Sequence, residues 1–251
     1  MIAWKYTKQR SLSVKVKIRN IPDFSEEVRD ILQLSTINLS PSPQVPHPPL
    51  KPLILGITGA SGLIYAIRAI KYLLEADYQI ELVASRSTYM VFQAEDQIRL
   101  PSEPEEQELF WREQAGVPTA GKLRCHRWGD VGANIASGSF RTQGMIIIPC
   151  SMSTVGKLAA GLSGDLLERA ADVQLKEGRK LVIVPRETPF SLIHLRNLTA
   201  LAEAGAAIVP ACPAWYHKPQ SIDDLVDFVI ARALDRLDID CIPINRWKVD
   251  E

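Results

Sequence analysis

The segment Leu53–Gly62 constrains the fold more than any other stretch of this chain. An apolar run stops at small residues, Thr58 to Gly62, and the residues that follow place apolar side chains at helical spacing. This pattern predicts a strand, a tight turn and a helix, with Thr58 or Ser61 as the helix cap. Glycine lets a ligand approach the backbone, so the turn is compatible with a phosphate site. A purely structural turn is equally compatible, because the spacing matches neither the dinucleotide fingerprint nor the P-loop.

The composition limits the class of protein. A chain of 251 residues can hold one α/β domain with additional segments. The formal net charge is +0, which predicts neither a nucleic-acid partner nor a membrane partner. No apolar run approaches the ~20 residues that span a bilayer, and the first residues lack the apolar core of a signal peptide. The expected location is therefore the cytoplasm.

The four cysteines and four histidines are scattered along the sequence. No C-x-x-C spacing is present. Together with the missing signal peptide, this distribution predicts reduced thiols and no bound metal.

Residues 1–50 differ from the rest of the chain. Six basic residues and no acidic ones precede Asn20, and the segment 41–49 is rich in proline, which is typical of a stiff spacer. We therefore expect an N-terminal extension with a proline-rich linker at 1–50 and one domain at 51–251. The extension is compatible both with a disordered tail and with a small structured arm.

Strand and helix patterns alternate regularly after residue 51. Short unbroken apolar runs such as Met145–Ile148 and Leu181–Val184 predict strands that are buried on both faces. The alternation predicts a doubly wound, open parallel sheet. Strands are expected near 52–57, 79–84, 123–128, 144–149, 180–185 and 206–210. Helices are expected near 62–76, 87–95, 105–115, 154–161, 165–178, 190–204 and 221–237.

Nearly every predicted strand is followed by hydroxyl groups, glycines or a charge. Ligands of such sheets bind beyond the carboxyl ends of the strands, so these segments are expected to lie together and to bind a polar ligand with a phosphate group. The segments are Thr58–Ser61, Ser85–Ser87, Asp130–Ser139, Pro149–Thr154, Pro185–Phe190 and Pro210–His217.

Some of the candidate residues have two interpretations. Cys150 follows a strand, but no nearby residue is an obvious base, which favours a small buried side chain over a nucleophile. Arg186 and Glu187 stand between two prolines, which limit the conformations of the loop. This favours two charged side chains with fixed directions over a plain surface ion pair. Arg169 and Lys176 share one face of a helix, which suits a solvated surface or a phosphate pocket equally well. Asp165 can cap that helix.

Six motifs together resemble the UbiX family of flavin prenyltransferases, within the wider group of homo-oligomeric flavin-containing Cys-decarboxylase-like proteins. The resemblance spans about 52–247, so it does not cover the extension. The motifs are Gly56–Gly62, Ala136–Ser139, Pro149–Ser151, Glu168–Val173, Val184–Phe190 and Trp215–Pro219.

This resemblance implies a Rossmann-like, flavodoxin-type subunit that binds FMN and assembles, usually as a homododecamer. It implies transfer of a dimethylallyl group from dimethylallyl phosphate to reduced FMN, with new bonds at flavin N5 and C6 and without a metal. The product, prenylated FMN, would serve a UbiD-type decarboxylase.

The resemblance also implies roles for individual residues. Catalytic roles fall to Ser61, near flavin N5, and to Glu95, Lys176 and Glu187. FMN contacts fall to Gly59, Ala60, Ser61, Ser85, Ser151, Met152, Ser153, Thr154 and Arg169. The dimethylallyl phosphate pocket comprises Lys176, Arg186, Glu187, Tyr216, Arg232 and Trp247.

The chain departs from the family at one wall of the site. Some members carry an aromatic residue there, beside the prenyl group, where this sequence has Val131, with Trp128 slightly earlier. Two other functions stay open: a flavin-dependent decarboxylase of a peptidyl or pantothenoyl cysteine, and a non-catalytic FMN-binding interaction protein. The loop Pro149–Thr154 lacks the signature of the cysteine decarboxylases, which favours the prenyltransferase.

Overall fold

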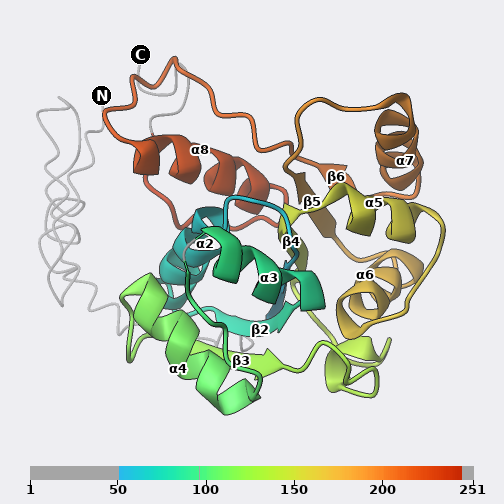
Figure 1. Ribbon diagram of the computed structural model, residues 1–251, viewed down its shortest axis with the longest axis horizontal. Coiled ribbons are helices and arrows are strands. Elements are labelled where there is room, and N and C mark those ends of the chain that lie inside the picture. The colour runs from blue at the N-terminus through green and yellow to red at the C-terminus, as the bar shows by residue number, and fades with distance from the viewer. Residues whose placement is uncertain (1–50, 96, 245–251) are drawn as a thin grey trace, which may run out of the picture. The chain divides into compact units, whose positions relative to one another are not determined.

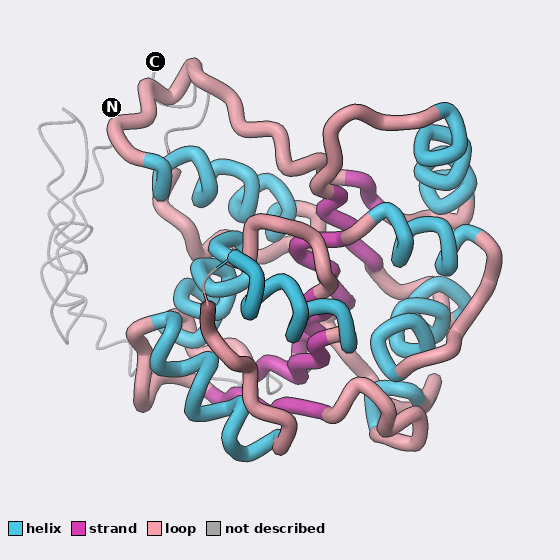
Figure 2. Tube along the Cα trace, viewed as in Figure 1, coloured by secondary structure: helices cyan, strands magenta, loops and turns pink. Residues whose placement is uncertain are grey.

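The computed structural model describes residues 51–95 and 97–244. Within them the centre of the fold is a six-stranded sheet whose paired strands all run parallel (Figures 1 and 2). The strand order is β3-β2-β1-β4-β5-β6. This confirms the predicted doubly wound, Rossmann-like α/β sheet. The strands are β1 (Leu53–Ile57), β2 (Gln79–Ala84), β3 (Lys122–His126), β4 (Gly144–Cys150), β5 (Leu181–Pro185) and β6 (Ala207–Ile208).

Helices cover both faces of the sheet. One core cluster joins the sheet to α2 (Ile64–Glu75), α4 (Pro104–Ala115) and α8 (Ile222–Asp235), with Phe92 of α3 (Arg86–Glu95). The other joins it to α5 (Met152–Ala159), α6 (Leu166–Lys176) and α7 (Leu192–Glu203), which lie together on one side of the view in Figure 1. Each of these elements begins and ends within two residues of its predicted bounds. A short 3-10 helix, η1 (Asn134–Ala136), was not predicted.

Side chains of β1 alternate between the two clusters, as a strand buried on both faces requires. Leu55 packs in the cluster of α2 and Ile54 in the cluster of α6. Gly56 faces α6 so closely that an added Cβ would lie 3.2 Å from Leu167. This close approach brings α6 directly against the centre of the sheet.

The chain adds β2 and β3 on one side of β1, and then adds β4, β5 and β6 on the other side. β1 pairs with β2 on one side and with β4 on the other. In doubly wound sheets the crevice at such a reversal, at the carboxyl ends of the strands, is the usual place for a ligand. A ligand is therefore expected at the loops after β1 and β4.

One predicted strand-end segment lies elsewhere, and its placement was wrong. Ala136–Ser139 belongs to the connection from β3 to β4, which must return to the amino end of the parallel strand β4. Arg179, just before β5, donates to the carbonyl oxygens of Gly138 and Phe140. The segment therefore lies toward the amino ends of the strands, away from the predicted ligand edge.

The predicted helix caps have mixed outcomes. Asp165 caps α6 as predicted, because its carboxylate accepts from the backbone amide of Glu168 at 2.9 Å. Neither Thr58 nor Ser61 caps α2, whose N-cap position is Leu63 and has no side-chain cap. No helix within the described ranges has the length and apolar character needed to cross a bilayer. The extension 1–50 and Trp247 lie outside the described residues.

Candidate functional site

Hydrogen bonds join the loops at the carboxyl ends of four neighbouring strands. Ser85 N donates to Ile57 O at 2.8 Å, which links β2 to β1. Thr58 Oγ1 donates to Pro149 O at 2.9 Å and accepts from Ser151 N at 2.7 Å, which links β1 to β4. The adjacent bond from Arg186 N to Cys150 O, at 3.1 Å, links β4 to β5. The strand ends thus form one continuous, cross-linked edge.

The loop after β1 needs glycine for a steric reason. A Cβ at Gly59 would lie 2.5 Å from the Cβ of Ser87, and the Gly59 amide donates to Ser87 Oγ at 3.2 Å. Gly62 has a φ of +98°, and its amide donates to Glu95 Oε2 at 3.3 Å. The structure therefore brings Glu95, predicted from the resemblance, against the predicted loop.

Three hydroxyl groups follow β2. The buried Ser85 Oγ lies 2.9 Å from Ser87 Oγ and 3.2 Å from Thr88 Oγ1. Thr88 Oγ1 in turn donates to Ile57 O at 2.9 Å. Only Ser85 was among the predicted contacts. The signal for the other two was the sequence itself, which places hydroxyls at three of four positions after a strand.

The loop after β4 begins a helix with a capped first turn. Ser151 is the N-cap of α5, and its Oγ accepts from Thr154 N at 3.2 Å. Met152 and Thr154 are buried, whereas Ser153 is exposed. The first amides of a helix have no partner within it, so this turn offers donors beside the loop after β1.

Arg186 connects the loop after β5 to the loop after β1. Its Nε donates to Ser61 O at 3.0 Å. The guanidinium forms no ion pair with Glu187 or with another carboxylate of the described residues, so the plain surface ion pair is not what the structure contains. The Glu187 carboxylate instead accepts from Thr188 N at 3.0 Å. The remaining guanidinium donors are available to an anion next to Ser61.

Tyr65 lies close to this arginine and was missed from the sequence. Burial raises the pKa of Tyr65, with a smaller rise from Cys212, and the positive charge of Arg186 opposes both. A Cβ at Gly62 would lie 3.2 Å from the Tyr65 ring. An aromatic side chain in the first turn of a helix carries no special sequence signal, because it is equally typical of a core position.

Two predicted basic residues lie on the outer face of α6. Arg169 and Lys176 are exposed, whereas Glu168 is buried and its carboxylate contacts Lys157 Nζ at 2.7 Å. α6 starts at the carboxyl edge, where Leu166 N donates to Trp128 O, and its last residue is Lys176. β5 then runs from the amino edge back to the carboxyl edge over five residues, a length of about 17 Å, and Arg186 follows it. Lys176 and Arg186 of one chain therefore lie at opposite ends of the sheet.

Tyr216 and Arg232 form a third group, around Phe228 of α8. The rings of Tyr216 and Phe228 meet edge to face at 5.6 Å, and His217 stacks on Phe228 at 5.0 Å. Phe228 and Arg232 also line a cleft of about 520 Å³ along β6. Arg232 Nη1 donates to Asp235 at 2.9 Å.

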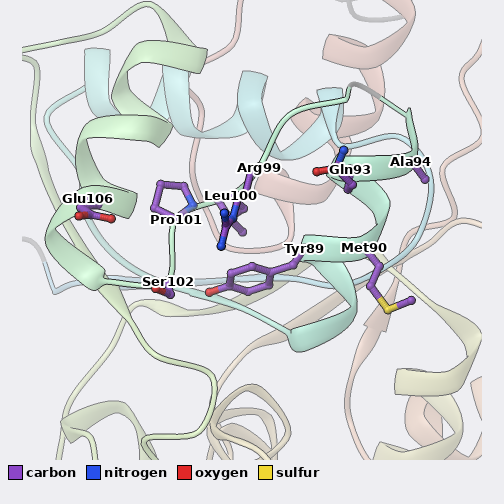
Figure 3. A pocket seen from close by; sticks show the side chains of 9 residues that line it. All are labelled: Tyr89, Met90, Gln93, Ala94, Arg99, Leu100, Pro101, Ser102 and Glu106. Atoms are coloured by element: carbon purple, nitrogen blue, oxygen red, sulfur yellow. The ribbon is translucent and has the colours of Figure 1, made fainter.

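Two clefts of about 760 Å³ each flank α3, away from most of the predicted contacts. Figure 3 shows the first, where the ring of Tyr89 of α3 extends toward the segment 99–102, which lines the same cleft. The second contains Trp128, whose ring lies 6.0 Å from the guanidinium carbon of Arg86. The ring of Trp128, the aromatic residue nearest to Val131 at the predicted prenyl wall, is therefore covered in part by Arg86.

Cys150 is the small buried residue that the sequence favoured. Its side chain is 0% exposed, and burial raises the pKa of its thiol well above the ordinary value. A thiol in this state has little thiolate at neutral pH and does not act as a nucleophile.

Comparison with known proteins defines the class. Residues 43–234 match the family model described as Flavoprotein. The "Flavin prenyltransferase UbiX" of Synechocystis sp. is 72% identical over 198 residues, which is 79% of this chain and 96% of that protein. The "Flavin prenyltransferase UbiX" of Pseudomonas aeruginosa is 43% identical, over 78% and 93% of the two chains.

Solved structures give the same result. A crystal structure of AnUbiX (PadA1) "in complex with FMN and dimethylallyl pyrophosphate" has a TM-score of 0.69 and 37% identity, and covers 80% of this chain and 100% of that one. A "dodecameric FMN-dependent Ubix-like Decarboxylase" from Escherichia coli O157:H7 has a TM-score of 0.67 and 41% identity, over 78% and 98%. The fold and the family model thus define a flavoprotein. Within that class, the chain belongs to the UbiX-type flavin prenyltransferases.

Proposed function

We propose that this protein transfers a dimethylallyl group from dimethylallyl phosphate to reduced FMN. The observation that carries the proposal is the bond from Arg186 Nε to Ser61 O, because it holds a cation next to the loop that is expected to bind the flavin. A phosphate bound by the free edge of that guanidinium would lie beside the flavin and not at a remote surface. Membership of the UbiX-type family supports the same reaction.

The residues at the strand ends fit FMN. Hydroxyls and helix amides at Ser85 and in the segment 151–154 are the donors that a phosphate and a ribityl chain require. The space beside Gly59 is too small for a Cβ because Ser87 packs against this glycine, which holds the loop after β1 against the segment after β2. Ala60 and Ser61 complete the loop. Reduced FMN, when bound, supplies the nucleophilic ring atoms that receive the prenyl group.

The basic residues serve the leaving phosphate. A monophosphate leaves readily only when its developing negative charge is neutralised, and fixed cations do this without reorganisation. In the proposal Arg186, Lys176 and Arg232 supply that charge, Tyr216 donates to a phosphate oxygen, and Trp247 closes the pocket. Arg169 is assigned to the FMN. Such a clamp would take the place of a metal ion.

Two carboxylates are assigned to proton transfer. Glu187 adjoins Arg186 in the chain and is half-buried, so it can protonate the departing phosphate or remove a proton from the alkylated ring. Glu95 is held against the loop after β1 by the amide of Gly62. Ser61 would orient the flavin nitrogen that attacks the donor.

The proposed site requires more than one copy of the chain. Arg186 lies at the carboxyl edge, Lys176 at the other end of α6, and Arg232 beside β6, so no single copy surrounds a donor with all three cations. A homo-oligomer can bring these surfaces together. The E. coli relative is described as dodecameric, which supports a dodecamer here. The prenylated FMN would pass to a UbiD-type decarboxylase in the cytoplasm.

The direct test is an anaerobic incubation of the protein with reduced FMN and dimethylallyl phosphate, followed by mass spectrometry of the released flavin. A parallel reaction with dimethylallyl pyrophosphate, the ligand in the AnUbiX structure, identifies the preferred donor. The proposal predicts a flavin heavier by one dimethylallyl unit with at least one donor. An unchanged flavin with both donors would contradict it.

A further inference from the structure

Thr58 is a fully buried hydroxyl residue between the two loops that are expected to hold FMN. It follows β1 directly and is 0% exposed. Its Oγ1 donates to Pro149 O at 2.9 Å and accepts from Ser151 N at 2.7 Å, so both hydrogen-bonding capacities of the hydroxyl point across to the loop after β4. Neither the family resemblance nor the comparisons assign this residue a role.

The two bonds of the hydroxyl are not equally replaceable. Pro149 O also accepts from the backbone amide of Thr58, at 3.2 Å, so it keeps a partner if the hydroxyl is removed. The amide of Ser151 has Thr58 Oγ1 as its partner, and Ser151 is the N-cap of α5. The side chain of Thr58 therefore acts mainly on the residue that starts this helix.

The position of Ser151 sets the direction of the donors that follow it. Its Oγ accepts from Thr154 N and lies 3.1 Å from Thr154 Oγ1, so the first turn of α5 is built on this residue. A β-branched side chain has few rotamers, and a buried threonine therefore holds its hydroxyl in one direction. A fixed Ser151 presents the donors of the first turn at a constant distance from Gly59–Ser61.

We infer that Thr58 is a positioning residue that fixes the loop after β4 relative to the loop after β1, so that both contact FMN without rearrangement. The inference rests on the proposed function, since it is the flavin that would span the two loops. Thr58 itself touches no ligand in this account. It acts through Ser151. Without the hydroxyl, the first turn of α5 would become ordered only when the flavin binds, which would weaken flavin binding.

The experiment compares T58V, which keeps the shape and removes the hydroxyl, with T58S, which keeps the hydroxyl. The matched control is T142V. Thr142 is also buried and its hydroxyl donates to Gln174 Oε1 at 2.8 Å, but it lies just before β4, at the far end of the sheet. For each full-length chain, the dissociation constant for FMN, the KM for reduced FMN, kcat and the denaturation midpoint are measured.

T58V is expected to weaken FMN binding and to raise the KM for FMN by about tenfold, the effect of one buried hydrogen bond, with a smaller change in kcat. T58S is expected to stay within about twofold of the wild type. T142V is expected to lower the denaturation midpoint without changing FMN binding. Unchanged FMN binding in T58V, or equal weakening in T142V, would overturn the inference.

Hydrogen exchange at the Ser151 amide of the wild type, measured without FMN, keeps the inference testable if T58V fails to fold. Slow exchange before flavin is added is the expected result, and exchange that slows only after addition would overturn it. A wild-type chain that binds no FMN at all contradicts the proposed function. If the wild type and T58V bind FMN equally well, only the role of Thr58 is contradicted.

Discussion

The carboxyl edge of the sheet and the outer face of α6 carry the same kinds of predicted residue but are built very differently. At the edge, Arg186 is tied to Ser61 O, and Thr58 is tied to Ser151 N. On α6, Arg169 and Lys176 are exposed. The first region is organised by hydrogen bonds within one chain, whereas the second is an exposed helix face.

The two regions are therefore suited to different tasks in the proposed site. The preorganised edge is suited to holding the flavin and orienting one cation, since its groups are fixed before a ligand arrives. The exposed cations are suited to a site completed by another copy. Changes at the edge should therefore affect each chain by itself, and changes on α6 should affect its neighbour.

The substitution Glu187→Gln should have the largest effect on turnover. It removes the group assigned to proton transfer while keeping its size, so prenyl transfer should slow by about 10²–10⁴-fold with little change in FMN binding. Single-turnover measurements with reduced FMN and dimethylallyl phosphate test this. Wild-type turnover in Glu187→Gln would show that the carboxylate has another role.

Arg186→Met should slow transfer by about 10²–10³-fold, the usual effect of removing one preorganised charge-stabilising donor. FMN should still bind. Arg127→Met is the matched control, because Arg127 is an exposed arginine that pairs with Glu103. Equal losses in both variants would mean that general charge, and not the bond to Ser61 O, matters.

Tyr72→Phe tests the packing of α8 on α2, because α8 holds Arg232 and the Phe228 ring that Tyr216 contacts. Tyr72 OH donates to Asp227 Oδ2 at 2.6 Å, and the same carboxylate pairs with Arg68, which fixes α8 on α2. Burial, together with the bond to Asp227, raises the pKa of Tyr72 from 10.0 to about 12. The neutral phenol is therefore favoured in the folded state.

The stability difference between wild type and Tyr72→Phe should be about 1 kcal/mol at neutral pH. It should be complete below about pH 10 and should disappear as the pH rises through about 12, because the phenol then loses its proton in the folded state too. Urea denaturation of both proteins across this range measures it. A difference that does not depend on pH would contradict the raised pKa.

Cys150→Ala should have the smallest effect. Cys150 is buried and its thiol is protonated, so transfer should stay within about twofold of wild type, with a loss of stability of about 1 kcal/mol from the missing sulfur. A large loss of turnover with intact folding would favour thiol chemistry at this edge.

Much of this organisation followed from local sequence. The alternation of apolar runs predicted the sheet, and Asp165 was predicted as a cap because the cap and its helix are adjacent in the chain. The predicted cap of α2 was wrong because the hydroxyl of Thr58 bonds instead to residues more than ninety positions away, at the end of β4 and just after it. Such partners depend on which strands become neighbours, which local patterns do not contain.

The remaining differences have the same origin. Ala136–Ser139 was placed at the wrong edge because a connection between parallel strands must cross the sheet, and the residue at which it crosses depends on how it packs on α6. Tyr65 was missed, and Ser87 was predicted only as part of a strand-end segment, because their roles come from contacts with Arg186 and Gly59. The separation of Lys176 from Arg186 follows from the direction of α6.

The central claim is that one flavin site draws its cations from more than one copy of the chain. A direct test mixes Lys176→Met and Arg186→Met subunits, each expected to be slow alone, by joint refolding or co-expression and measures prenyl transfer. Activity is expected to return, because some sites in the mixed oligomers carry neither change. Mixed oligomers that form and transfer no faster than either variant alone would contradict it.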